Sequence, residues 1–216
     1  SWEDAEGKVI PFVAADGRSQ DQILWEPGCT YEMAPFRVRN EGNLNAKILI
    51  LLNGVTGSGK TEVYIRVIRR ALELGKTAIV LVPEIALTPQ SVSIFCARYG
   101  ERVSVIHSGL SSGERYDAFC RIRDGLSDVV IGTRSAVFAP VKNLGAIIID
   151  EEQEHTYKSD SNPKYHARDA ARFRCAHSKA LMLLASATPS LESYYKAERG
   201  IYSLITLKKR YGNASL

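Results

Sequence analysis

The octapeptide GVTGSGKT at residues 54–61 has the composition and spacing of a phosphate-binding loop. In such loops the glycines let backbone N–H groups point at phosphates, the lysine reaches the β- and γ-phosphates, and the following hydroxyl binds Mg²⁺. The alternative is a chance glycine-rich turn, which the strand and helix expected on either side argue against. We expect the nucleotide to be bound by Gly54, Gly57, Ser58, Gly59, Lys60 and Thr61, with Thr61 also a ligand of Mg²⁺.

A second run, AIIIDEEQ at residues 146–153, is an apolar segment that ends in acids. Asp150 would hold Mg²⁺, usually through water, and Glu151 would polarise a water molecule that attacks a phosphate. A solvated acidic turn is the alternative, and the phosphate-binding loop earlier in the chain argues against it. Lys60, Asp150 and Glu151 are therefore the candidate catalytic residues.

The tripeptide Ser-Ala-Thr at residues 186–188 follows another apolar run. Small hydroxyl residues at the end of a strand could hydrogen-bond the acids and link the nucleotide to the rest of the protein. We expect Gln153, Ser186 and Thr188 to have this coupling role. By itself, Ser-Ala-Thr-Pro is also a good helix cap.

The elements that would position these motifs alternate along the chain after residue 46. Apolar runs predict buried strands at 48–52, 78–82, 103–106, 129–131, 146–149 and 181–184. Amphipathic segments predict helices at 61–74, 89–99, 112–123, 167–177 and 189–199. Three helix starts have capping residues: Ser111 with Glu114, Thr88 before Pro89, and Thr188 before Pro189. The pattern predicts an α/β fold with a mainly parallel sheet flanked by helices, which binds ligands beyond the carboxyl ends of its strands.

The first 46 residues are polar and punctuated by glycine and proline, with weak β-like segments at 9–13, 23–25 and 36–38. They contain eight acidic and four basic side chains, whereas residues 47–216 contain sixteen acidic and twenty-four basic ones. A basic second part indicates a polyanionic partner. We leave residues 1–46 unassigned and expect residues 47–216 to form one nucleotide-binding domain.

Composition excludes several classes of protein. Apolar residues make up 45% of the 216 residues, but no apolar run approaches the roughly 18 residues of a membrane span. The first residues, SWED, lack the basic start and apolar stretch of a signal peptide. Cys29, Cys96, Cys120 and Cys175 form no C-x-x-C pair, which predicts reduced thiols and no local zinc site. We therefore expect a cytoplasmic protein without a membrane partner.

Taken together, the phosphate-binding loop, the Asp-Glu box and the Ser-Ala-Thr motif resemble the superfamily 2 helicases of the DEAH-like kind. Seven blocks in order narrow the resemblance to the primosomal protein N′ (PriA) family of replication-restart helicases. They are GVTGSGKTEVY (54–64), VPEIALTPQ (82–90), HSGL (107–110), IGTRSA (131–136), DEEQ (150–153), YHARD (165–169) and ASATPSLES (185–193). The resemblance covers residues 48 to 212 and implies a RecA-like P-loop fold.

The resemblance implies an ATP-binding and hydrolysing lobe of a 3′-to-5′ DNA helicase, with ATP and Mg²⁺ as cofactors. Its partners would be single-stranded or forked DNA and replication-restart proteins. The residues implied to contact DNA are Pro83, Gln90, Thr133, Arg134, Tyr157, Lys158, Tyr165, His166 and Arg168. Those from Tyr157 onward lie in the stretch 154–168, which resembles an aromatic-rich loop linking DNA binding to hydrolysis and offers rings and cations for bases and phosphates. The alternative is a surface loop whose tyrosines pack on the domain.

Several parts of the family pattern are missing. The family has a cysteine-rich zinc region, a second RecA-like lobe with arginine fingers, and a helix with an adenine-contacting glutamine before the first strand. We find none of them here and expect a first lobe truncated before the second, with weak ATPase activity and no unwinding of its own. The alternatives are an ATP- and DNA-binding module without helicase activity, and an unrelated P-loop NTPase such as a kinase or a GTPase. The absence of N-K-x-D argues against a GTPase.

Overall fold

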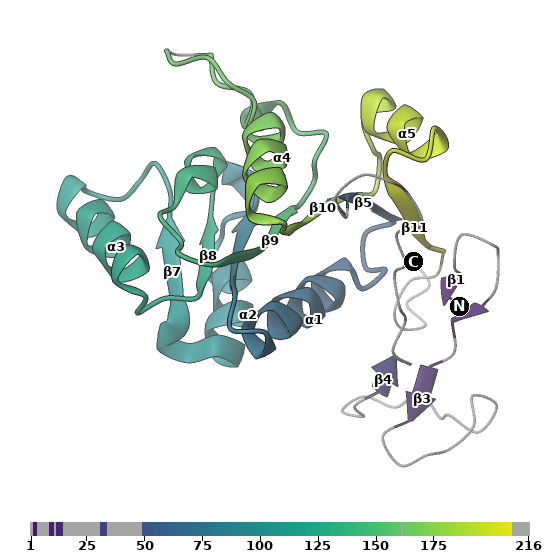
Figure 1. Ribbon diagram of the computed structural model, residues 1–216, viewed down its shortest axis with the longest axis horizontal. Coiled ribbons are helices and arrows are strands. Elements are labelled where there is room, and N and C mark those ends of the chain that lie inside the picture. Colours follow the sequence, from purple (N-terminus) through teal and green to yellow (C-terminus); the bar gives the residue numbers. More distant parts are fainter. Residues whose placement is uncertain are drawn as a thin grey trace.

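The computed structural model describes residues 49–160 and 162–208, and four short strands before them at residues 2–3, 9–10, 12–14 and 31–33. Its centre is a nine-stranded sheet in the order β2-β1-β11-β5-β10-β9-β6-β8-β7 (Figure 1). The seven strands from β11 to β7 are parallel: β5 (Leu49–Gly54), β6 (Thr77–Leu81), β7 (Val103–Ile106), β8 (Val129–Gly132), β9 (Leu144–Ile149), β10 (Leu181–Ser186) and β11 (Ser203–Leu207). The predicted α/β fold with a mainly parallel sheet is confirmed.

Short antiparallel strands precede this sheet in the chain. β1 (Trp2–Glu3) pairs with β11 and with β2 (Val9–Ile10). β3 (Phe12–Ala14) and β4 (Tyr31–Met33) form a separate two-stranded sheet. The β-like segment predicted at 9–13 thus corresponds to two strands, while those predicted at 23–25 and 36–38 lie outside the described residues.

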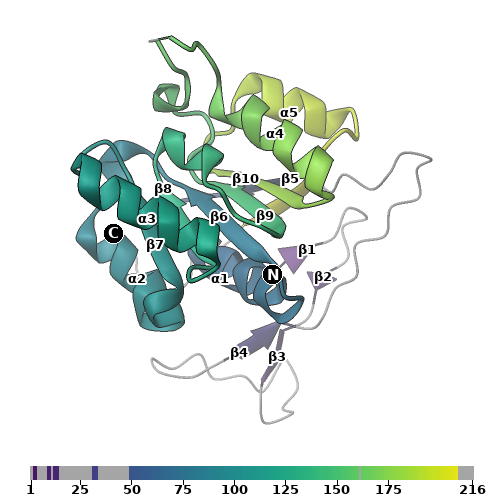
Figure 2. The same ribbon diagram turned by 60° about the vertical axis from the view of Figure 1, so that its left-hand side comes forward.

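Helices cover both faces of the parallel sheet (Figure 2). The α-helices of the described part are α1 (Lys60–Glu73), α2 (Pro89–Tyr99), α3 (Ser112–Asp124), α4 (Ala167–Ser178) and α5 (Leu191–Glu198). The described part also contains short 3₁₀ helices, labelled η2 (Glu84–Ala86), η3 (Gly100–Arg102), η4 (Arg134–Phe138) and η5 (His155–Tyr157). Residues of α1 and α2 pack in one core cluster, and residues of α3 and α4 pack in the other.

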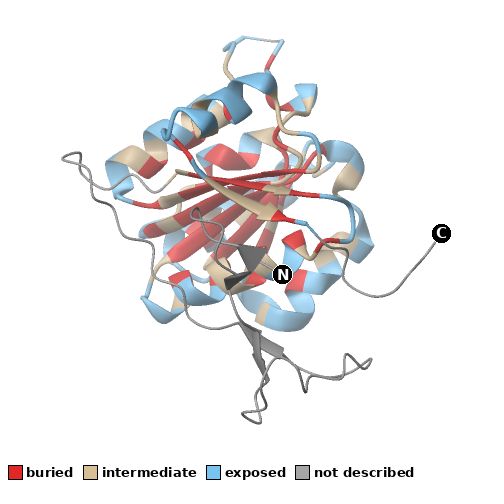
Figure 3. Cartoon of the chain, turned by 90° about the vertical axis from the view of Figure 1, so that its right-hand side faces the viewer, coloured by how far each residue is buried: buried red, intermediate tan, exposed pale blue. Residues whose placement is uncertain are grey.

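Alternate residues of each central strand face opposite helical layers. Leu51 of β5 packs in the cluster that contains Ala171 of α4, whereas its neighbours Ile50 and Leu52 pack with Ile68 of α1. A strand covered on both faces has no polar side to expose, so its sequence is a continuous apolar run. Figure 3 shows the resulting buried sheet between more exposed helices.

Two of the three predicted helix starts are confirmed. The side chain of Thr88 accepts a hydrogen bond from the Ser91 amide (3.1 Å), and Pro89 is the first residue of α2. Ser111 accepts one from the Glu114 amide (3.3 Å), and the Glu114 carboxylate accepts one from the Ser111 amide (2.9 Å). These contacts satisfy amides that the helix itself leaves without partners.

The predicted start of the last helix, at Thr188 before Pro189, is wrong. The Thr188 amide donates to Oγ of Ser186 (2.8 Å), which holds this segment in a turn. The cap is Ser190, whose Oγ accepts from the Ser193 amide (3.3 Å), so α5 begins two residues later than expected.

The sequence patterns also miss β11. Its residues, SLITL, form no continuous apolar run, because Ser203 and Thr206 are polar, and its three middle side chains are only half-buried. β11 lies between β5 and the two-residue strand β1, near one edge of the sheet, where less of a strand is covered. Apolar runs identify the fully buried central strands but not this partly covered one.

The topology brings three motifs to one edge. β5, β10 and β9 are neighbours in the sheet and run in the same direction. Their carboxyl ends are followed by the glycine-rich loop, the Ser-Ala-Thr segment and the acidic run, respectively. Residues distant in sequence therefore meet at the edge where parallel sheets bind ligands.

Candidate functional site

The glycine-rich loop connects β5 directly to α1. Gly57 and Gly59 have φ angles of 78° and 91°, a region that residues with a Cβ rarely adopt. Gly54 is required for a different reason, because a Cβ there would lie 2.5 Å from Oγ of Ser58 and 2.8 Å from Cβ of Leu207. The loop thus has the backbone shape that points amide groups toward a phosphate.

Lys60 opens α1 and points into this loop. Its Nζ donates a hydrogen bond to the Gly54 carbonyl (2.8 Å) and lies 3.6 Å from Oε1 of Glu151. The Lys60 side chain is only 10% exposed, so its charge is available to a ligand at the loop more than to bulk water. The ammonium group therefore bridges the phosphate-binding loop and the acidic run.

The loop fits a nucleotide polyphosphate. Oγ of Ser58 is buried and, among the described side chains, has no hydrogen-bond partner. Within residues 49–160 and 162–208, no backbone acceptor takes a hydrogen bond from the amides of Gly57, Gly59, Lys60 or Thr61. A cradle of free donors beside a buried ammonium group is the donor set that phosphate oxygens require.

Asp150 follows β9 and is fixed by two hydrogen bonds. Its Oδ1 accepts from the Tyr64 hydroxyl (2.6 Å) and from the Glu151 amide (3.0 Å). Burial raises the pKa of the Asp150 carboxyl, and the hydrogen bond from Tyr64 acts in the opposite direction. Burial, and next the charge of Asp150, raise the pKa of Tyr64 well above its ordinary value, which keeps the phenol a hydrogen-bond donor. One carboxylate oxygen of Asp150 is thereby oriented.

Glu151 has an unusual backbone conformation. Its φ angle is 43°, in the left-handed region that a non-glycine residue adopts only under constraint. Oε2 of Glu151 accepts a hydrogen bond from Nε2 of Gln153 (3.0 Å), and Oε1 faces Lys60. The side chain is 32% exposed, so a water molecule could reach it.

A line of hydrogen bonds continues from Glu151 to the Ser-Ala-Thr segment. Oγ of Ser186 donates to Oε1 of Gln153 (2.5 Å), and the Thr188 amide donates to Oγ of Ser186. The structure thus brings together Lys60, Glu151, Gln153 and Ser186, whereas Thr188 takes part through its backbone. Their roles in catalysis and coupling stay predictions.

The two other segments that are predicted to contact DNA follow β6 and β8, which are neighbouring strands of the sheet. The Val82 amide, after β6, donates to the Gly132 carbonyl of β8 (2.9 Å). Pro83 and Thr133 are buried, whereas Gln90, at the start of α2, is exposed. Of these side chains, only that of Gln90 is open to a polyanion in this structure.

Arg134 connects the second of these segments to the aromatic-rich loop. Its Nη1 donates to the carbonyls of Thr156 (3.3 Å) and Lys158 (2.5 Å), and its guanidinium lies 5.9 Å from the centre of the Tyr165 ring. The Tyr165 ring also meets that of Phe138 edge-on, at a centroid distance of 5.0 Å. Arg134 and the aromatic-rich loop are therefore neighbours in the structure.

The loop borders an open cavity. Residues 158 and 166 pair as an antiparallel bridge, and the Ser159 amide donates to the Tyr165 carbonyl (2.8 Å). A cavity of about 370 Å³ is lined by Lys158, Ser159, Asp160, Lys164, Tyr165 and His166. Lys158 and Lys164 are exposed, and Tyr165 and His166 are half-buried. Cations and ring faces thus lie side by side here.

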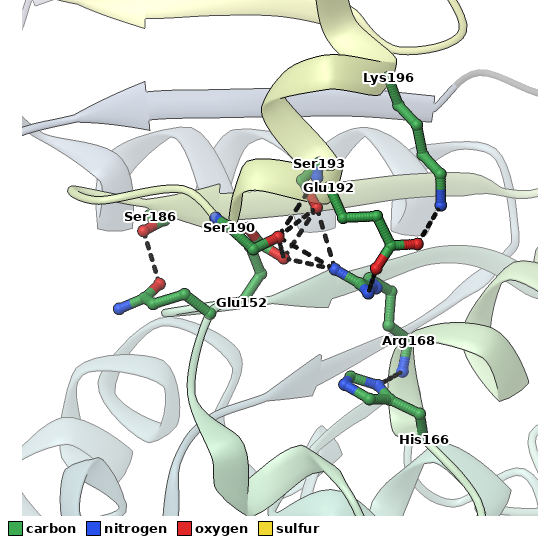
Figure 4. Close-up of polar contacts among 9 residues, drawn as sticks. Glu152, His166, Arg168, Ser186, Ser190, Glu192, Ser193 and Lys196 are labelled. Carbon is green, nitrogen blue, oxygen red and sulfur yellow. Dashed lines mark hydrogen bonds and ion pairs between the residues drawn. The ribbon is translucent and has the colours of Figure 1, made fainter.

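Two of the side chains predicted to contact DNA are turned inward in this structure. Tyr157 is 1% exposed, and its hydroxyl lies 2.6 Å from the Asp150 carbonyl and 3.1 Å from the Leu81 carbonyl, so its ring cannot stack on a base. The Arg168 guanidinium is 11% exposed and is turned toward Glu152 and Glu192 (Figure 4), so it does not offer a free charge to phosphate. The tyrosine packs on the domain, as the alternative interpretation of the loop held.

The model for the DEAD/DEAH box helicase family matches residues 43–197. The chain belongs to the DEAD/DEAH box helicase family. Its mainly parallel sheet flanked by helices is the RecA-like fold of solved helicase domains.

The predicted resemblance to PriA is confirmed by the similarity of this chain to named PriA proteins. The sequence is 54% identical over 162 residues to the replication restart protein PriA of Bacillus subtilis (strain 168), which covers 75% of this chain and 20% of that protein. It is 52% identical over 161 residues to PriA of Chlamydia trachomatis, which covers 74% of this chain and 21% of that protein. The chain thus spans about a fifth of the length of these curated relatives.

The fold of this helicase domain is similar to that of a solved structure of RecG bound to a three-way DNA junction. The TM-score is 0.56 at 26% sequence identity, over 79% of this chain and 22% of that chain. Within the described part of the helicase domain, no helix has the length and apolar character needed to cross a membrane. The described residues also contain no group of three or more His, Cys, Asp or Glu side chains placed to hold a metal ion, and Cys29 lies outside them.

Sequence reasoning missed three polar residues of this helicase site. Tyr64 lies four residues after Lys60, a spacing that places both side chains on the same face of α1. That spacing could have placed Tyr64 beside the acids. Glu152 and Ser193 are buried polar residues in the motif blocks, and no local pattern distinguishes them from solvated ones.

Proposed function

We propose that the chain is the ATP-binding and hydrolysing motor lobe of a 3′-to-5′ DNA helicase that acts in replication restart. The observation that supports this most directly is the line of contacts from Lys60 through Glu151 and Gln153 to Ser186. It joins a phosphate-binding loop, a carboxylate and a segment that leads to α5. The names of the PriA relatives supply the proposed biological setting.

Hydrolysis would be the in-line attack of water on the γ-phosphorus of ATP, with a new bond to the water oxygen and release of ADP and phosphate. Glu151 would accept a hydrogen bond from that water and orient it, and the Lys60 ammonium would face the charge developing on the phosphate oxygens. Thr61 and Asp150 would hold Mg²⁺, which when bound neutralises charge on the β- and γ-phosphates. The orientation of Asp150 by Tyr64 supports the assignment of this carboxylate.

Single-stranded DNA would bind along the aromatic-rich loop, which follows the acidic run in the chain. Lys158 and Lys164 would meet phosphates, and Tyr165 and His166 would offer ring faces to bases at the cavity. Arg134, which already contacts the loop backbone, and Gln90 would extend this surface. Stacking tolerates any base, as a motor that moves along DNA requires.

Coupling between the two ligands would pass through the backbone between Asp150 and the loop. The Tyr157 hydroxyl contacts the Asp150 carbonyl, and Arg134 contacts the carbonyls on either side of Tyr157. Movement of the loop on DNA would therefore reach the carboxylates over a short distance. Forked DNA and other replication-restart proteins are the proposed partners, and a chain working on bacterial DNA would act in the cytoplasm.

The proposal is tested by measuring ATP binding and phosphate release with and without single-stranded DNA. We expect the parent chain to bind ATP with Mg²⁺ and to release phosphate slowly, at a rate that single-stranded DNA increases. Binding without any phosphate release would leave an ATP- and DNA-binding module and would contradict the proposed hydrolysis. Equal affinity for GTP would contradict the choice of nucleotide.

A further inference from the structure

Glu152 is a fully buried carboxylate beside the proposed water-orienting residue. Its side chain has no exposed surface. It accepts hydrogen bonds from the Ser190 amide (2.7 Å), Oγ of Ser190 (3.2 Å), Oγ of Ser193 (2.9 Å) and Nη1 of Arg168 (3.1 Å). A buried charge is tolerated when it is paired and hydrogen-bonded in this way. Glu152 thus joins the acidic run to the starts of both α4 and α5.

Arg168 is held on two sides (Figure 4). Nη1 meets Glu152, and Nη2 lies 2.5 Å from Oε2 of Glu192, whose other oxygen lies 2.6 Å from Nζ of Lys196. The hydrogen bond from Lys196, followed by the charge of Arg168, lowers the pKa of the Glu192 carboxyl. The arginine is thereby fixed between a buried and an exposed carboxylate.

The backbone next to Glu152 is strained. Glu151 has its φ angle of 43°, and such residues persist only where the surrounding structure determines their conformation. The flanking amides are anchored to neighbouring strands, Asp150 N to the Leu81 carbonyl (2.9 Å) and Glu152 N to the Ala185 carbonyl (3.0 Å). The side-chain bonds of Glu152 add a third anchor on the same side of Glu151.

We propose that Glu152 and Arg168 form a positioning pair that holds Glu151 in its left-handed conformation and so sets the place of its carboxylate. Neither residue touches the reacting atoms. This inference rests on the proposed function of Glu151 in hydrolysis, and it gives Arg168 a role other than phosphate binding. Because Arg168 follows the bridged loop segment 158–166 by two residues, a ligand on that loop acts on Glu151 through this pair.

The test compares Glu152→Gln and Arg168→Gln with the control Asp128→Asn in the full chain. Asp128 forms an ion pair with Arg102 (2.6 Å) at the start of β8, away from the site. For each protein we measure kcat and KM for ATP, the thermal midpoint, and the hydrogen exchange of the backbone amides at residues 150–154. The exchange data report on the backbone conformation without requiring turnover.

In both site variants we expect kcat to fall about tenfold or more, because displacement of a reacting group by about 1 Å is enough for such a loss, while KM stays within about twofold. Exchange of the Glu152 and Glu154 amides should be faster at temperatures well below the thermal midpoint, because the turn opens locally. The control should change neither kcat nor this exchange.

The proposal is overturned if the site variants show the parent's hydrogen exchange at residues 150–154 and the parent's kcat. Their thermal midpoints do not affect this conclusion. A lower midpoint alone would mean that the pair only joins α4 to α5, which also overturns it. If the parent chain shows no turnover, the proposed hydrolysis fails, and the exchange data alone decide whether the pair holds the turn.

Should a site variant not fold, Ser193→Ala replaces it. This change removes one 2.9 Å hydrogen bond to Glu152 and leaves both charges in place. Faster exchange at residues 150–154 is expected again, with a smaller fall in kcat. If the Ser193→Ala variant has the same hydrogen exchange at residues 150–154 and the same kcat as the parent, the proposal is contradicted.

Discussion

The hydroxyl of Tyr64 donates a 2.6 Å hydrogen bond to Oδ1 of Asp150, across a sequence separation of 86 residues. We predict that Tyr64→Phe raises the Mg²⁺ concentration needed for half-maximal ATP turnover several-fold, because Asp150 loses the donor that orients it. The free energy of unfolding should fall by about 1–3 kcal/mol, the cost of losing a hydrogen bond to a charged group. Titrations of turnover with Mg²⁺, together with urea unfolding, check both.

Tyr99→Phe is the matched control for this prediction. The Tyr99 hydroxyl donates to the Ile65 carbonyl (2.8 Å) on the same helix as Tyr64, away from the acids. The Tyr99→Phe variant should have a lower free energy of unfolding but the same Mg²⁺ dependence of ATP turnover as the parent. A Mg²⁺ dependence that is equal in both variants would mean that Tyr64 only packs.

Lys60→Ala should abolish measurable ATP binding while the chain stays folded. Among the described residues, the Lys60 ammonium is the one cation that contacts both the Gly54 carbonyl and the Glu151 carboxylate, and Lys60 is the first residue of α1. Calorimetric titration with ATP and Mg²⁺, combined with a thermal melt, separates the two effects. ATP affinity within a few-fold of the parent's would refute the assignment of the phosphate-binding loop.

Glu151→Gln should bind ATP and Mg²⁺ like the parent but hydrolyse ATP more slowly, by about 10²-fold or more, since the amide does not orient water as a carboxylate does. Glutamine also fits the left-handed turn no worse than glutamate, so stability should change little. Phosphate release in a single turnover gives the rate. A rate equal to the parent's would place the water-orienting role elsewhere.

The sequence was sufficient to predict the motifs of this site and their meeting place. Lys60 and Thr61 lie in a pattern defined by local spacing, and Asp150 and Ser186 each follow a run of apolar residues that only a buried strand explains. Parallel strands then bring their carboxyl ends to one edge whatever their order, so the site could be predicted without knowing the sheet order.

Side-chain direction in the connecting loop could not be predicted. Tyr157 and Tyr165 are both aromatic residues in a polar segment, and no periodicity distinguishes the buried ring from the half-exposed one. Glu152 is adjacent to the predicted Glu151, and only its tertiary partner Arg168 shows that its side chain is buried. These assignments depend on contacts between residues far apart in the chain.

The two loop tyrosines should respond differently to truncation. Tyr157→Ala should destabilise the fold by about 3–5 kcal/mol, as expected for a fully buried aromatic side chain. Tyr165→Ala should cost little stability and weaken single-stranded DNA binding by about 1–3 kcal/mol for each base it stacks on. Thermal melts and DNA titrations at two salt concentrations measure both. Normal DNA binding by a folded Tyr165→Ala variant would locate the binding surface away from the cavity.

His166 provides the pH-dependent prediction, because Nδ1 of its ring accepts a hydrogen bond from the Arg168 amide (3.1 Å) as the N-cap of α4. Burial lowers the pKa of His166 and the charge of Arg168 lowers it further, while Asp169, Glu192 and Glu152 act in the opposite direction. The folded-state pKa therefore lies below the unfolded value of about 6.5. Neutral His166 stabilises the fold above that pH, and this stabilisation is lost as the pH falls through the folded-state pKa.

Acidification from about pH 7.5 to about pH 5.5 should accordingly lower the free energy of unfolding, and His166→Asn should make this fall smaller. Asparagine is a good N-cap whose acceptor does not titrate, so the variant keeps the cap while removing its pH dependence. The control is His177→Asn, in the exposed last turn of the same helix, which leaves the cap unchanged. Urea unfolding of the three proteins at both pH values provides the comparison. If the pH dependence of His166→Asn equals that of the parent, the His166 imidazole does not titrate as the cap geometry requires.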